Sequence, residues 1–104
     1  AVKLYTAPPL APGCMIIGTA TTEAPTHPKI AEAARFLLGK IEELLIVAFE
    51  RAVAAGEIAP QPDPTTRARL AGALFDTLAV RARLGGSPKE LRAFALSMVP
   101  AICR

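Results

Sequence analysis

The chain has little of what catalytic and metal centres are made from. Among its 104 residues are one histidine, His27, and two cysteines, Cys14 and Cys103, without a Cys-x-x-Cys pair. A metal site needs several ligands at close spacing, and a nucleophile needs a base beside it. The sequence therefore predicts no metal site, no cofactor and no enzyme. We interpret His27 as a substitute N-cap for a helix that begins at Pro28.

The same scarcity bears on the cellular compartment. Two cysteines are too few for a disulfide scaffold, and no secretory signal accompanies them. Both are expected to be buried, reduced thiols of a cytoplasmic protein, and a Cys14–Cys103 disulfide is the alternative. The longest apolar stretch, residues 41–53, is interrupted by charged side chains, so no membrane span is predicted. Because no methionine starts the chain, we expect a fragment or a processed product.

Residues that read DNA sequence are also scarce. The net charge is only +3, asparagine is absent, and the one glutamine, Gln61, lies in a proline-rich stretch. Asparagine and glutamine are the bidentate readers of adenine, and a nucleic-acid surface is densely basic. We therefore expect no sequence-specific DNA binding by this chain alone.

Apolar residues, by contrast, are in excess. They make up 52% of the chain, and the mean hydropathy is +0.37. Disordered chains are poor in apolar residues, so we predict one folded domain over residues 1–104. A domain of this size cannot hide so many apolar side chains by itself, which indicates a buried interface between subunits.

The periodicity of these apolar residues predicts an all-α domain whose clearest helix covers residues 28–55. Pro28 suits the first helical position, and Gly56 supplies the stop. Polar residues occupy the opposite side of this helix, as in an amphipathic helix that packs on other elements. The apolar stripe consists of Ile30, Ala34, Leu37, Ile41, Leu44, Leu45, Ala48 and Ala52.

Two further helices follow, over residues 64–84 and 88–103. Asp63 is the expected N-cap of the first, which ends at Gly85 and Gly86. Ser87-Pro88-Lys89-Glu90 is a capping box that opens the second. The apolar ridges of the two helices consist of Leu70, Leu74 and Leu78, and of Leu91, Phe94, Ala95, Met98 and Ile102.

The residues before position 28 predict a short buried helix over residues 14–23. Met15, Thr19 and Thr22 would place a thioether and two hydroxyls on one side of it. Such a mixture suits a pocket for a moderately apolar ligand, and the alternative is that they are ordinary core and turn residues.

Several short segments follow one another in a particular order. Gly13-Cys14-Met15-Ile16-Ile17 precedes the short helix, the long helix ends in residues 50–58, and Asp63-Pro64 comes next. Residues 78–87 then lead into the last helix. In this order and spacing, over nearly the whole chain, the sequence resembles the C-terminal domain of TetR-family transcriptional regulators.

The resemblance implies a homodimer in which the last two helices of each subunit form a four-helix bundle. It also implies a small-molecule effector among the central helices, and a DNA-binding helix-turn-helix domain that precedes the residues present here. On this reading we assign the dimer interface to the apolar faces of the last two helices. The assigned residues are Leu74, Leu78, Arg81, Leu91, Phe94 and Met98.

Arg81 stands out because it follows the apolar ridge of the helix over residues 64–84. A charge there needs a partner or access to water. Its side chain could reach solvent with its stem packed, pair across the dimer interface, or contact an anionic ligand.

The predicted function is effector sensing and homodimerisation in a TetR-type repressor that releases DNA when a small effector binds. The alternative is a helical homodimerisation module without a small-molecule ligand.

Overall fold

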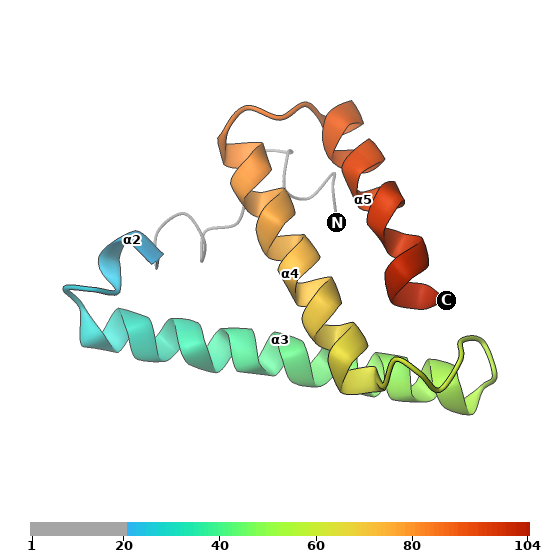
Figure 1. The fold of residues 1–104 in the computed structure, drawn as a ribbon. Helices are drawn as coiled ribbons and strands as arrows, with labels where there is room; N and C mark the ends of the chain where they lie inside the picture. Colours follow the sequence, from blue (N-terminus) through green and yellow to red (C-terminus); the bar gives the residue numbers. More distant parts are fainter. Residues whose placement is uncertain (1–20) are drawn as a thin grey trace.

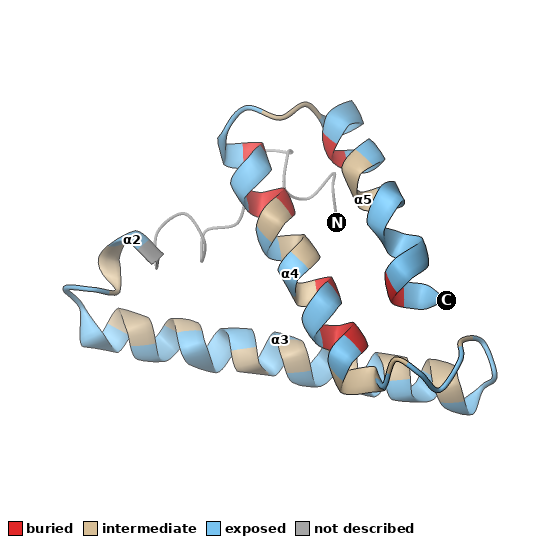
Figure 2. Ribbon diagram, in the orientation of Figure 1, coloured by how far each residue is buried: buried red, intermediate tan, exposed pale blue. Residues whose placement is uncertain are grey.

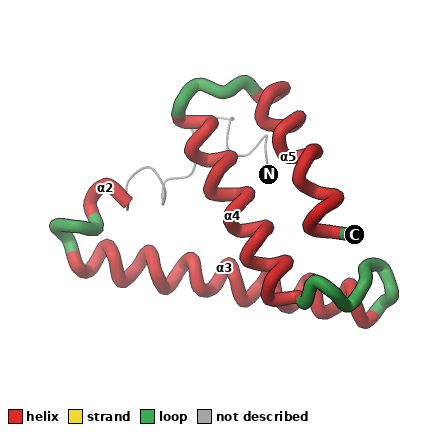
Figure 3. The backbone as a smooth tube through the Cα atoms, in the orientation of Figure 1, coloured by secondary structure: helices red, strands yellow, loops and turns green. Residues whose placement is uncertain are grey.

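The computed structural model describes residues 21–104, which form four helices and no strand (Figure 1). The predicted all-α fold is confirmed. The helices are α2 (Thr21–Glu23), α3 (Pro28–Ala54), α4 (Pro64–Arg83) and α5 (Pro88–Cys103), joined by the loops and turns shown in Figure 3. The three long helices begin and end within one residue of their predicted bounds. Most of the predicted helix over residues 14–23 lies outside the described residues.

The start of α3 corrects the interpretation of His27. His27 occupies the N-cap position, but its side chain makes no cap hydrogen bond. Its Nδ1 lies 2.9 Å from Thr26 Oγ1 and 3.4 Å from Glu23 Oε2 instead, so the imidazole is engaged with the preceding turn. The backbone carbonyl of His27 accepts from the amides of Ile30 and Ala31, as the start of any helix requires. His27 therefore takes the predicted N-cap position before Pro28, but its side chain caps no amide of α3.

The caps of α4 and α5 are those that the sequence predicts. Asp63 Oδ1 accepts a hydrogen bond from Thr66 N at 3.2 Å, and Ser87 Oγ accepts one from Glu90 N at 3.1 Å. Each bond satisfies an amide that has no partner within its own helix. Hydrogen bonds from the side chain and backbone of Thr66 also hold the pKa of Asp63 below its ordinary value.

The turn between α4 and α5 depends on two glycines. Gly85 has φ +90°, a left-handed conformation that other residues rarely adopt. At Gly86 a Cβ would lie 3.0 Å from the carbonyl oxygen of Arg81 and 3.3 Å from Leu91 Cδ2. The turn can therefore be this tight only because both positions lack side chains.

α4 is the central helix of the described structure. It crosses α3 on one side and runs antiparallel to α5 on the other (Figure 1). Among the described helices, α5 contacts α4 alone. Leu78, Ala82 and Leu91 form a buried cluster between α4 and α5, against which Leu74 and Phe94 also pack. The apolar packing in this hairpin of α4 and α5 is thus closest in the half nearest the turn that joins the two helices.

α3 contributes no buried residue, although it is the longest helix (Figure 2). Among the described helices, α3 is contacted mainly by α4, which crosses it, and to a smaller extent by the short α2. No helix in this part of the chain is long and apolar enough to cross a membrane. The large apolar side chains that α3 leaves exposed are Phe36, Leu37, Leu38, Ile41, Leu44 and Val47.

Cys103 does not have the buried position that the sequence predicts. It is a free, exposed thiol at the last residue of α5. Its neighbour Ile102, only 7% exposed, occupies the buried position of this final turn instead. Cys14 lies outside the described residues, so only the Cys103 half of the prediction is overturned.

Candidate functional site

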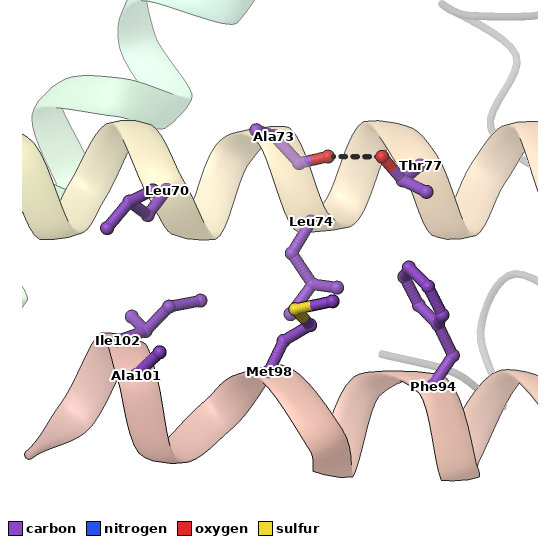
Figure 4. Close-up of a pocket in the computed structure, with 8 residues that line it drawn as sticks. All are labelled: Leu70, Ala73, Leu74, Thr77, Phe94, Met98, Ala101 and Ile102. Atoms are coloured by element: carbon purple, nitrogen blue, oxygen red, sulfur yellow. Dashed lines mark hydrogen bonds between the residues drawn. The ribbon is translucent and has the colours of Figure 1, made fainter.

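α4 and α5 leave an apolar groove between them beyond the buried cluster (Figure 4). Its volume is about 250 Å³, somewhat below the roughly 300–1,000 Å³ of ordinary small-molecule pockets. Side chains from both helices point into it, as Figure 4 shows for Leu74, Phe94 and Met98. The lining residues are Leu70, Ala73, Leu74, Thr77, Phe94, Met98, Ala101 and Ile102.

The groove offers almost no polar chemistry. Thr77 is its one hydroxyl, and that hydroxyl donates a 3.0 Å hydrogen bond to the Ala73 carbonyl oxygen of its own helix (Figure 4). Leu70 and Met98 remain 44% and 42% exposed. A shallow hollow of this size and character suits apolar side chains from another helix better than a polar metabolite.

Five of the six predicted interface residues, all but Arg81, divide into two groups. Leu74, Phe94 and Met98 line the groove, where another subunit could contact them. Leu78 and Leu91 are only 1% exposed, because they pack against each other between α4 and α5 of the same chain. Contacts within one subunit are thus enough to bury Leu78 and Leu91.

Arg81 is exposed, and its guanidinium lies over the ring of Phe94. The distance from Arg81 Cζ to the ring centroid is 4.0 Å. A cation over an aromatic face is attracted by the ring, by about 0.5–1 kcal/mol at an exposed site. Of the roles considered for Arg81, the structure therefore shows a packed side chain with its charge at the surface.

The predicted ligand residues are described only in part. Thr22 belongs to the three-residue helix α2 and is exposed. Met15 and Thr19 lie outside the described residues. The three are therefore not shown together, and the ligand pocket they would form stays a prediction.

Arg67, on the first turns of α4, is a residue that the sequence analysis missed. It is fully buried, at 0% exposure, and is the one charged residue in the core of residues 21–104. Its Nε donates to the Pro62 carbonyl oxygen at 2.7 Å. Its two terminal nitrogens donate to four more main-chain oxygens, those of Ala59, Gln61, Ile102 and Arg104.

The position of Arg67 in the helical repeat could have indicated that it is buried. Residues 67, 71, 74 and 78 fall on one face of α4 at steps of three and four. A charge on that face needs a partner, which is the argument that drew attention to Arg81. No sequence pattern reveals backbone carbonyls as partners, however, because every residue has one.

Two further carboxylates bear on the charges of α4, those of Glu42 on α3 and Asp76 on α4 itself. Arg69 Nε lies 2.9 Å from Glu42 Oε1 and ties the exposed side of α4 to α3. Partial burial raises the pKa of Asp76 through the loss of hydration. In the part of the chain that the structure describes, no three metal-binding side chains lie close enough to hold a metal ion.

Comparison with known proteins gives one match. The family described as "Tetracyclin repressor-like, C-terminal domain" matches residues 1–98, nearly the whole chain. Neither the curated proteins nor the solved structures contain a match.

Proposed function

Since the chain belongs to the tetracyclin repressor-like C-terminal domain family, we propose that it is the homodimerisation and effector-sensing part of a TetR-type repressor. The full regulator would bind DNA through an N-terminal helix-turn-helix domain and release it when a small effector binds. This is a regulatory role in the cytoplasm of a bacterium, with no catalytic step.

The observation that carries the dimer proposal is the groove between α4 and α5. In the proposed dimer, these two helices pair with their symmetry copies as a four-helix bundle. Leu70 and Met98 flank an apolar hollow whose hydroxyl is already bonded within α4. Covering this face with its own copy would remove apolar surface from water and leave no polar group unsatisfied.

The effector proposal rests on family membership and on α3. Its exposed apolar side chains would give a pocket one apolar wall, which most small-molecule sites have. An effector acts on DNA release only through a difference in its affinity for two subunit arrangements. The alternative proposal is a helical homodimerisation module that binds no small molecule.

Charge placed in the groove tests the dimer. We expect Leu70→Glu and Met98→Glu each to convert a dimer into a monomer in analytical ultracentrifugation, because a buried unpaired carboxylate is costly. Leu44→Glu is the matched control, since Leu44 is 72% exposed on α3 and lies outside the groove. A dimer that survives both groove substitutions would contradict the proposed interface.

A thermal-shift screen of metabolites separates the two proposals. A ligand present at a hundred times its dissociation constant stabilises the folded state by about 2.7 kcal/mol. We expect at least one compound class to raise the melting temperature in a saturable manner. A screen without any such compound would favour the module that has no ligand.

A further inference from the structure

Arg67 joins two segments that are distant from each other in the sequence. Three of its carbonyl acceptors, those of Ala59, Gln61 and Pro62, belong to the connection that leaves α3. The other two, those of Ile102 and Arg104, are at the end of α5. Within residues 21–104 no aspartate or glutamate side chain pairs with this guanidinium, and the acceptors of its hydrogen bonds are main-chain oxygens.

The Ile102 carbonyl is among the last carbonyls of α5, which a helix leaves without internal donors, and Arg104 is the C-cap residue that follows the helix. The last carbonyls of a helix also carry the negative end of its dipole, which favours a cation at that place. Hydrogen bonds from a charged donor are about twice as strong as those between neutral groups. Arg67 therefore acts on α5 as a cap supplied by another helix.

α5 is consequently fastened near its two ends. Leu91 holds its first turns in the buried cluster with Leu78, and Arg67 holds its last turn. The groove lies along the stretch between these attachments and reaches Ile102. α5 has no contact with α3 in the described structure, so the Arg67 bonds are its tie to the α3–α4 connection.

We propose that Arg67 is a positioning residue that holds the C-terminal half of α5 and thereby sets the shape of the groove. This rests on the proposed function, because the groove is where the second subunit is proposed to bind. A change at the end of α3 would move the three carbonyls of the connection and, through Arg67, the end of α5. The interface would then respond to the part of the domain proposed to sense the effector.

Hydrogen exchange tests the positioning role in the full chain. In Arg67→Met we expect the amides of residues 97–103, apart from Pro100, which has none, to exchange about tenfold faster or more. Exchange near Leu91 should change little, since only local opening is affected. Arg69→Met is the matched control, because Arg69 lies on the same helix but is exposed and makes one surface ion pair. It should leave both regions within about threefold of the wild type. Equal acceleration in all helices, or none at the end of α5, would overturn the proposal.

The dimer dissociation constant tests the link to the groove. By sedimentation, we expect Arg67→Met to weaken the dimer about tenfold, or 1.4 kcal/mol, with Arg69→Met unchanged. If Arg67→Met speeds exchange at the end of α5 but leaves the dimer dissociation constant unchanged, the link between Arg67 and the groove is overturned. If the wild-type protein shows no dimer, the proposed function fails, while the exchange pattern still decides the positioning role.

A lysine variant covers the case in which the methionine variant does not fold. Arg67→Lys keeps the charge but offers three donors in place of the five N–H groups of a guanidinium. The same end of α5 should exchange faster, by a smaller factor. A lysine variant indistinguishable from the wild type at this end would count against the need for the guanidinium.

Discussion

Truncating Leu78 to alanine separates the core of one subunit from the proposed interface between two. Leu78 is 1% exposed and packs against Leu91 and Ala82 of the same chain. Leucine-to-alanine changes in such sites cost about 2–5 kcal/mol, the lost transfer energy plus the cavity left behind. A domain of this size has roughly 5–15 kcal/mol of stability, so the loss is a large fraction of the total.

Urea unfolding followed by circular dichroism measures this loss. With a slope of about 1–3 kcal/mol per M, a loss of about 3 kcal/mol lowers the midpoint by roughly 1–3 M. Because Leu78 is covered within its own chain, Leu78→Ala should leave the dissociation constant of the folded dimer nearly unchanged. Met98→Ala should instead weaken the dimer and leave the free energy of unfolding of the subunit nearly unchanged, since Met98 is 42% exposed and lies in the groove.

One pattern would refute the reasoning. If Leu78→Ala weakened the dimer more than tenfold and changed the unfolding free energy by less than about 1 kcal/mol, Leu78 would act between subunits. The core of the α4–α5 hairpin would then have been misassigned.

Other predictions follow from the caps and the thiol. Ser87→Ala should cost about 1 kcal/mol and lower the melting temperature by roughly 4–8 °C in calorimetry, because Glu90 N loses its acceptor. The lowered pKa of Asp63 means that its stabilising effect is present above its ordinary value of 3.8 and is lost as the pH falls through the lower folded value. The difference in melting temperature between wild type and Asp63→Ala should therefore shrink below pH 3.8, and a constant difference would contradict the ionised cap. In a Cys14→Ala background, Cys103 should react with a thiol reagent without unfolding, and protection until the melt would contradict its exposed position.

Local signals explain why the fold could be predicted so closely. The ends of the long helices are set by residues that act on their immediate neighbours, such as Asp63, Ser87 and Gly85. Periodicity then identifies the apolar faces, and family resemblance supplies the topology. The ends and the apolar faces of the helices can therefore be predicted without knowing which helix packs on which.

What could not be predicted from the sequence is how one apolar face of α4 is divided between a buried cluster and a groove. Leu74 and Leu78 share a ridge of α4, yet Leu78 is buried against α5 and Leu74 lines the groove. Their exposure depends on the path of α5, which no local pattern specifies. The buried position of Arg67 and the exposed one of Cys103 depend on the same path, because both concern the last turn of α5.

The hairpin of α4 and α5 also implies an order of folding. Its caps and its turn involve residues a few positions apart, and contacts of short sequence separation form early because little chain entropy is lost. The hydrogen bonds from Arg67 to Ile102 and Arg104 close loops of 35 and 37 residues.

We therefore expect Leu78→Ala to slow folding, and Arg67→Lys to act mainly by speeding unfolding, in stopped-flow kinetics. A folding rate lowered as much by the lysine as by the alanine would reverse this order. On this view the hairpin forms first and its far end is held last, so the end of α5 is also the part of the hairpin that opens first.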